Sequence, residues 1–256
     1  MEKTAQSLSF YRDAMRVLLD ADVPFLLGGA YALALYTGIE RHTKDFDLFL
    51  RETDLDRAMR GFERQNFRVD RTHPHWLAKA YCGDDCIDLI YRAGNGLCDV
   101  DESWFERGRS DEALGVAIKL VAPEDIIWMK AFIMERERFD GADIAHLLYS
   151  CADKLDWQHL VRRFGEHWRV LLSHLVLFGF IYPSEKHRVP QSVISELLQW
   201  TIEDQHVAER EAICRGTLLS RAQYLVDVNE RGLRDARLSG AMSEADVARW
   251  TAAIEE

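Results

Sequence analysis

Two aspartates, Asp45 and Asp47, stand at alternate positions of the apolar segment DFDLFL, shortly after a glycine pair, Gly28 and Gly29. Because side chains alternate along a strand, the two carboxylates are expected on one face. Two carboxylates about 5 Å apart repel by roughly 3 kcal/mol at an effective dielectric near 20, and a divalent cation between them removes this cost. Aspartate oxygens are hard ligands of the kind that Mg²⁺ or Mn²⁺ prefers. The spacing predicts a metal site; the alternative is an exposed edge strand whose acids face water.

The glycine pair lies between a predicted strand, residues 24–27, and a predicted helix, residues 30–38. Glycine lets the backbone come close to a ligand, and the N–H groups at a helix start can bind phosphate oxygens. The alternative interpretation is a plain tight turn. A phosphate site followed by paired carboxylates favours metal-assisted phosphoryl or nucleotidyl transfer.

The whole segment LLGGAYALALYTGIERHTKDFDLFL, residues 26–50, resembles the signature of the nucleotidyltransferase superfamily that includes DNA polymerase β. That signature is an apolar residue, Gly-Gly or Gly-Ser, a spacer, and Asp-x-Asp between apolar residues. The RHTKDFDLF part is similar to the Arg-x-Thr-x-Asp-x-Asp form of the bacterial stand-alone nucleotidyltransferases. The resemblance implies a metal-dependent enzyme that moves a nucleoside monophosphate from a nucleoside triphosphate to a hydroxyl acceptor and releases pyrophosphate. The acceptor it implies is a small molecule, a protein or a tRNA.

Members of this superfamily carry a third acid on a later strand, and the segment CIDLIYR supplies Asp88. An acid within an apolar strand is unusual unless it has a role. Asp84 and Asp85 compete for this role, but they lie in a predicted turn, where acids are common. The resemblance implies that Asp45, Asp47 and Asp88 are the catalytic residues and the ligands of Mg²⁺ or Mn²⁺. Asp88 would also help to deprotonate the acceptor hydroxyl.

The same resemblance implies a set of nucleotide-binding residues, two glycines and four polar side chains: Gly28, Gly29, Arg41, Thr43, Lys44 and Lys130. The glycines would hold the β and γ phosphates through backbone N–H groups. The three polar residues that precede the acids either contact phosphate or form a solvated turn. The remaining lysine is a candidate triphosphate contact, with an exposed lysine on an amphipathic helix as the alternative.

The periodicity of apolar residues changes along the chain. Helical and strand patterns mix as far as residue 122, and only helical patterns follow. The pattern predicts an α+β fold, with a small mixed β-sheet and flanking helices in a catalytic domain, 1–122, and an all-helical C-terminal region, 123–256. Pro123 suits the first position of a helix, and Ser243 with Asp246 resembles a capping box.

Composition narrows the possible partners and location. The 256 residues carry a net charge of −11, which does not favour a nucleic-acid acceptor, although a local basic patch remains possible. The longest apolar run, 170–182, is too short to cross a bilayer, and a buried helix is the favoured interpretation. The N-terminal residues lack the pattern of a signal peptide. Five cysteines without zinc-type spacing are predicted to be free thiols. We therefore expect a cytoplasmic protein that has no membrane partner.

A second hypothesis belongs to another functional class. The same fold could serve as a nucleotide-binding regulatory or toxin–antitoxin module that does not catalyse. Binding alone would not require Asp88, so the third acid favours the enzyme.

Overall fold

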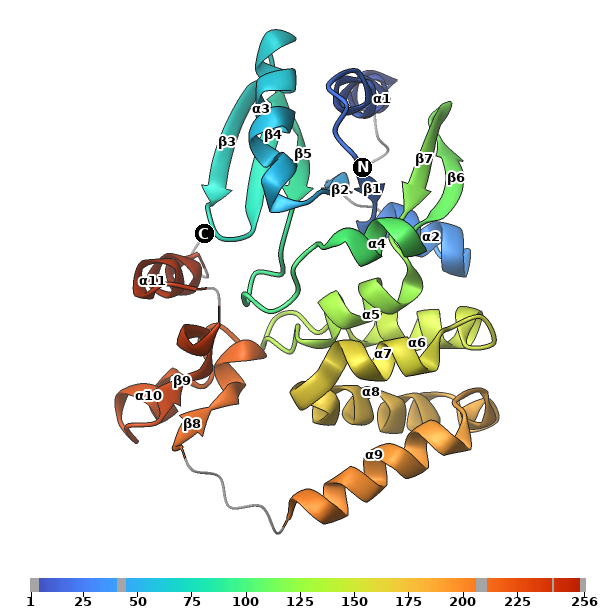
Figure 1. Cartoon of the computed structure of the whole chain (residues 1–256), viewed down its shortest axis with the longest axis vertical. Helices are drawn as coiled ribbons and strands as arrows, with labels where there is room; N and C mark the ends of the chain where they lie inside the picture. Colours follow the sequence, from blue (N-terminus) through green and yellow to red (C-terminus); the bar gives the residue numbers. More distant parts are fainter. Residues whose placement is uncertain (1–4, 41–44, 206–210, 241, 254–256) are drawn as a thin grey trace. The chain divides into compact units, whose positions relative to one another are not determined.

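The computed structural model describes residues 5–40, 45–205, 211–240 and 242–253. By its internal packing the chain forms two compact units, Met1–Ala122 with Ala241–Trp250, and Pro123–Gly240 with Thr251–Glu256. The first unit is built around a mixed sheet and the second is largely helical (Figure 1). The predicted α+β fold class is confirmed.

The sheet of the first unit has seven strands in the order β3-β4-β5-β2-β1-β7-β6. Its strands are β1 Leu26–Leu27, β2 Asp47–Phe49, β3 Arg68–His73, β4 Leu77–Cys82, β5 Asp85–Ile90, β6 Arg109–Ala113 and β7 Val116–Leu120. β2 runs parallel to β5, and β1 runs parallel to β7. The other neighbouring strands are antiparallel. The two strands that carry the predicted catalytic acids, β2 and β5, are therefore direct neighbours.

Helices flank this sheet, as predicted. They are α1 Ala5–Asp20, α2 Gly29–Thr37, the 3₁₀ turn η1 Glu52–Asp54, α3 Leu55–Arg64, α4 Glu102–Arg107 and α11 Glu244–Ala252. α1 packs on β5, β7 and α3 through the apolar face that its periodicity predicts. Ser243 and Asp246 form the predicted capping box at the start of α11, because the Ser243 backbone N–H and hydroxyl both donate to the Asp246 carboxylate.

Phe46, the residue between the two aspartates of the Asp-x-Asp motif, is fully buried. Its ring stacks on Tyr11 of α1, with ring centroids 4.5 Å apart, and meets the edge of Tyr31 of α2 at 5.0 Å. Burial of a large aromatic side chain stabilises a fold by roughly 1.5–3 kcal/mol. Because Phe46 is held in the core, its two aspartate neighbours are turned away from the core.

Two elements of the first unit are not visible in the sequence pattern. β6 has the sequence RSDEA, which is polar except for its last residue, Ala113, and shows no alternation of apolar residues. α4 has 6 residues, fewer than periodicity can reveal, and its start is fixed by Asp101, which accepts from the Ser103 N–H at 2.9 Å.

The second unit contains helices α5 Pro123–Ala131, α6 Gly141–Cys151, α7 Trp157–Phe164, α8 Trp168–Ile181, α9 Gln191–Asp204 and α10 Leu225–Asn229. Its short elements are η2 Gly165–His167, η3 Lys186–Arg188, β8 Ile213–Cys214, η4 Arg215–Leu218, β9 Arg234–Asp235 and η5 Ala236–Ser239. α5 begins at Pro123, as predicted, and packs against α6, α7 and α8. The short parallel pair of β8 and β9 is an addition to the predicted helical region.

α8 corresponds to the long apolar run and is buried on one side only. Leu171, Leu175 and Phe178 are in the core, but Val176 is 61% exposed and Phe180 is 81% exposed. The apolar run therefore forms a helix, as interpreted, but only one face of that helix is buried. None of the described helices combines the length and apolar character that a membrane span requires.

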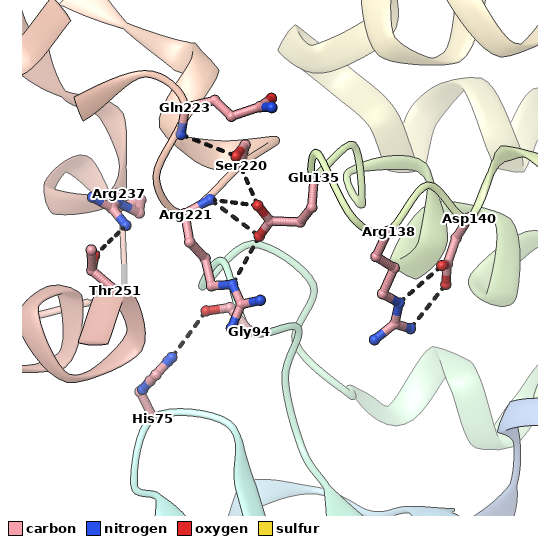
Figure 2. Close-up of polar contacts among 10 residues, drawn as sticks. All are labelled: His75, Gly94, Glu135, Arg138, Asp140, Ser220, Arg221, Gln223, Arg237 and Thr251. Carbon is pink, nitrogen blue, oxygen red and sulfur yellow. Dashed lines mark hydrogen bonds and ion pairs between the residues drawn. The ribbon is translucent and has the colours of Figure 1, made fainter. Parts of the chain in front are cut away.

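Hydrogen bonds and ion pairs connect the loops of the second unit. Glu135 accepts from the Ser220 hydroxyl at 2.7 Å and from the Arg221 guanidinium at 2.8 Å (Figure 2). Arg138 donates twice to Asp140, at 3.0 Å each (Figure 2). These contacts join the segment after α5 to α6 and to the segment after η4.

Candidate active site

The parallel pairing of β2 with β5 brings the predicted acids together. Asp47 and Asp88 are register partners, and the Asp88 N–H donates to the Phe46 carbonyl at 3.0 Å. Asp45 is exposed and precedes β2, which begins at Asp47 and is shorter than the predicted strand. Ligand atoms of Asp45, Cys86 and Asp88 all lie within 4.8 Å of one another. Two of the three predicted metal ligands therefore form a compact group, together with a thiol.

Asp47 lies against the start of α2. A Cβ atom added to Gly29 would stand 1.6 Å from Oδ2 of Asp47, so the carboxylate occupies space that only glycine leaves open. Gly29 also has a φ of 55°, which favours glycine. The positive end of the helix dipole favours a negative charge at this place. Asp47 and the N–H groups of the helix start are therefore neighbours.

Gly28 lets the start of α2 pack closely on β2, the strand that carries Asp47. Its N–H donates to the Asp47 carbonyl at 3.0 Å, which continues the pairing of β1 with β2. A Cβ at Gly28 would lie 2.2 Å from the Phe49 ring, which is buried. The glycine pair thus does more than form a tight turn, because it lets the start of α2 lie directly on β2.

Asp88 is buried and its charge is balanced by Lys79, its register partner on β4. The Lys79 ammonium lies 2.8 Å from Oδ1 of Asp88. Burial raises the pKa of Asp88, and the hydrogen bond and charge of Lys79 oppose this rise without cancelling it. Burial lowers the pKa of Lys79, but the hydrogen bond and charge of Asp88, together with Cys86 and Asp45, more than offset that effect, so the lysine pKa is raised. Lys79 is therefore a cation of the site.

Asp84 and Asp85, the two alternatives to Asp88 as the third carboxylate, lie elsewhere in the hairpin. Asp84 lies in the turn between β4 and β5, as predicted. Asp85 begins β5 and accepts from the Ser7 hydroxyl of α1, at 2.9 Å and 3.0 Å to its two oxygens. Within the described part of the chain, the group that includes Asp88 contains neither of them. The geometry favours Asp88 as the third carboxylate.

Residues 7–164 match a protein family described as "Nucleotidyl transferase of unknown function (DUF2204)". The chain belongs to this nucleotidyltransferase family. It is therefore an enzyme of the nucleotidyltransferase superfamily, as the resemblance of its Gly-Gly and Asp-x-Asp segments implies. No curated protein is similar enough in sequence to match.

Solved structures with a similar fold include two antibiotic-modifying proteins. The antibiotic-resistance factor ANT(2'')-Ia, solved with adenylyl-2''-tobramycin, is 17% identical; the match covers 65% of this chain and 99% of that one, with a TM-score of 0.45. The lincosamide antibiotic adenylyltransferase LnuA, bound to lincomycin, is 11% identical over 57% of this chain and 98% of that one, with a TM-score of 0.40. JHP933 from Helicobacter pylori is 14% identical over 80% and 98%, with a TM-score of 0.35.

The remaining nucleotide-binding predictions for this nucleotidyltransferase fall in two places. Arg41, Thr43 and Lys44 lie outside the described residues. Lys130 is on α5 of the second unit, where its ammonium lies 2.6 Å from Asp140 and 2.8 Å from Asp143. Its side chain is 16% exposed, so the alternative of an exposed surface lysine was wrong. Its contact with a triphosphate stays a prediction, and that contact would compete with two carboxylates.

Sequence reasoning missed two residues that lie beside the predicted acids, Lys79 and Cys86. Both follow from the hairpin, because a turn at residues 83–84 pairs Cys82 with Asp85 and therefore Lys79 with Asp88. Cys86 stands at the alternate position before Asp88, and residues at this spacing share one face of a strand. The turn was predicted, but the pairing of residues along the two strands was not worked out from it.

We expect Gly29→Ala to lose more stability than Gly38→Ala and also to lose metal–triphosphate binding. Both glycines have positive φ, 55° and 71°, so alanine adds backbone strain of about 1–2 kcal/mol at each. Only at Gly29 does the new methyl group also displace Asp47, since nothing lies within 4 Å of a Cβ at Gly38. Urea denaturation measures the first effect, and titration with Mn²⁺ and a nucleoside triphosphate measures the second. Equal binding by the two variants would contradict this placement of Asp47.

We expect Lys79→Met to move the acid limb of the pH–activity profile to higher pH. The pKa of Asp88 is already raised by burial, and loss of the ammonium raises it further. Activity that needs the ionised carboxylate is lost as pH falls through this raised pKa, so the loss begins at higher pH in the variant. Lys79→Arg keeps the positive charge and serves as the control. An unmoved acid limb in Lys79→Met would show that Lys79 does not set the ionisation of Asp88.

Proposed function

We propose that this nucleotidyltransferase moves a nucleoside monophosphate from a nucleoside triphosphate to a hydroxyl acceptor, with release of pyrophosphate, and that Mg²⁺ or Mn²⁺ is required. One observation carries the proposal. Carboxylate oxygens of Asp45 and Asp88 lie within 4.8 Å of each other, near enough to share one cation, while Asp47, the register partner of Asp88, lies at the glycine start of α2. Metal-binding and phosphate-binding groups therefore share one place on the sheet.

The donor atoms fit a divalent cation. Carboxylate oxygens are hard ligands, and their close approach is costly without a cation among them. Lys79 is placed to offset the negative charge of Asp88. Asp45 and Asp47 bring further negative charge to the site. When bound, a divalent cation would supply Lewis-acid stabilisation of the charge that develops on the attacked phosphate. We assign Asp45, Asp47 and Asp88 as the residues that would hold it.

The chain itself supplies phosphate binding and a base. The backbone N–H groups at Gly28 and Gly29 would bind the β and γ phosphates, because a helix start offers donors and a favourable dipole. The Gly28 N–H already donates to the Asp47 carbonyl at 3.0 Å, so it would have to exchange that bond for one to phosphate. Asp88 would accept the proton of the acceptor hydroxyl, since a carboxylate whose pKa is raised is a stronger base than an ordinary aspartate. Further triphosphate contacts are proposed for four side chains: Arg41, Thr43, Lys44 and Lys130.

The acceptor is proposed to be a hydroxyl of a small molecule, a protein side chain or a tRNA end. The net charge of −11 makes a nucleic acid the least favoured of the three. All five cysteines lie in described ranges, and none of them forms a disulfide there. Free thiols suit a reducing compartment, so we propose that the enzyme works in the cytoplasm.

We also propose a division of labour along the chain. Residues 1–122 would form the catalytic domain, because the sheet with Asp47 and Asp88 is complete within them. Residues 123–256 would form a helical region, which carries Lys130, the proposed triphosphate contact. Part of that region, Ala241–Trp250, packs with the first unit, where Trp250 stands edge-on to Trp76 at 5.2 Å between ring centroids.

Mn²⁺ or Mg²⁺ together with a nucleoside triphosphate should raise the melting temperature of the wild-type protein. At a ligand concentration of about 100 Kd the stabilisation is about 2.7 kcal/mol. The double variant Asp45→Asn, Asp47→Asn should fold and lose this shift, because two of the three proposed ligands lose their charge. Differential scanning fluorimetry with and without metal gives the comparison. If the double variant retains the full shift, the metal–nucleotide site lies elsewhere.

Pyrophosphate release from the four ribonucleoside triphosphates, with and without cell extract, tests the transfer itself. We expect slow metal-dependent release by the wild type, none by Asp47→Ala, and a loss of roughly a hundredfold or more in Asp88→Asn. Asp85→Asn is the matched control, since Asp85 is on the same strand and binds Ser7. Tight nucleotide binding without pyrophosphate under any of these conditions would contradict the proposal. Wild-type turnover by Asp88→Asn would assign the base to another residue.

A further inference from the structure

Cys86 adds a soft ligand to the proposed metal site. We propose that Asp45, Cys86 and Asp88 together bind a thiophilic divalent cation, Zn²⁺ or Cd²⁺, in competition with the Mg²⁺ or Mn²⁺ of nucleotidyl transfer. The inference deepens the proposed function, because it concerns which cations the same site accepts.

The backbone directs the thiol into the site. Cys86 and Asp88 occupy alternate positions of β5, while Ile87 and Leu89 on the other face are completely buried. Asp45 reaches the same place from the segment that precedes β2. One ligand atom from each of the three residues lies within 4.8 Å of the other two.

These separations suit a small cation after modest side-chain movement. Zinc binds thiolate sulfur at about 2.3 Å and carboxylate oxygen at about 2.0–2.2 Å. Ligand atoms around one such ion are therefore separated by roughly 3.3–3.7 Å. The three ligand atoms of the site lie within 4.8 Å of one another, so a bound ion would require them to move at most about 1.5 Å closer. Asp45 is exposed and Cys86 is half-buried, so both side chains have room to adjust.

Charge and ligand type favour a soft cation over a hard one. A thiolate and two carboxylates carry three negative charges, and Lys79, which contacts Asp88, offsets one of them. For these three ligands the remaining two negative charges match one divalent cation, and Asp47, the register partner of Asp88, adds a further negative charge beside them. Thiolates favour zinc and cadmium, whereas carboxylates alone suit Mg²⁺ and Mn²⁺. Binding converts the thiol to a thiolate, and its proton passes to the solvent.

The other four cysteines differ from Cys86 in burial or in position. Cys98, Cys151 and Cys214 are buried. Cys82 is half-buried like Cys86 and lies in the same hairpin, where its register partner is Asp85. Within the described residues, the group of potential metal ligands includes Cys86 and none of these four. Cys82 is therefore a matched control, a thiol of similar burial that stands outside the group.

The experiment is a titration of the reduced, metal-free full-length protein with Cd²⁺, in the absence of nucleotide. The ultraviolet charge-transfer band of a cadmium thiolate reports sulfur coordination directly and does not depend on enzyme activity. We expect one equivalent of Cd²⁺ to produce the band, and added Mn²⁺ to compete with it. Cys86→Ser should abolish the band, and Cys82→Ser should keep it.

The carboxylate variants decide whether the thiol acts within a site. Asp45→Asn and Asp88→Asn should each raise the Cd²⁺ concentration needed for the band by at least about tenfold, the lower end of losses seen when groups around a metal are removed. Melting temperatures without metal confirm that each variant is folded.

Three results would overturn the inference: no band in the wild type, a band that survives Cys86→Ser, or a band that is indifferent to both carboxylate variants. The pyrophosphate assay is independent of this titration. An absence of transfer would remove the proposed function and leave the cadmium result as it stands.

Discussion

The pairing of β2 with β5 is the interaction on which the site depends. It makes Asp47 and Asp88 register partners, and its bond from the Asp88 N–H to the Phe46 carbonyl extends the ladder to the residue beside Asp45. Burial of Phe46 against Tyr11 supplies the energy that holds this segment in place. A slip of one residue would turn Phe46 outward and the aspartates into the core, at a cost that no loop contact could offset.

The same pairing creates an electrostatic problem. Carboxylates gathered at one edge of a short strand repel one another, and burial of Asp88 adds a desolvation cost that raises its pKa. Lys79, on the adjacent strand β4, offsets part of this repulsion by its ion pair with Asp88. The remaining repulsion is the physical reason for proposing that the site binds a cation, since a bound cation would offset the cost of the cluster. In that proposal Cys86 influences which cations compete for the site.

Much of this arrangement could be predicted from the sequence, because its main features are local. Alternation in DFDLFL, the glycine pair and the helix start at Pro123 depend on neighbouring residues alone. Sequence reasoning failed where distant segments decide the outcome. The ion pair of Lys79 with Asp88 depends on hairpin register, and the place of Asp45 before β2 depends on where pairing with β5 begins. The exposed side of α8 could not be predicted either, because apolar composition alone does not say which face meets the core.

The charge of the whole protein decides the form in which a nucleotide can approach. A chain with a net charge of −11 repels a free triphosphate, and the carboxylates of the site add to that repulsion at short range. The helix start beside Gly29 attracts phosphate, but its partial charge is about half an elementary charge and Asp47 already lies against it. If the proposed cation is bound, attraction would come chiefly from it, because it neutralises the acids and the phosphates together. On the proposed function, the metal–triphosphate complex, and not the free nucleotide, is accordingly the species that the site would bind.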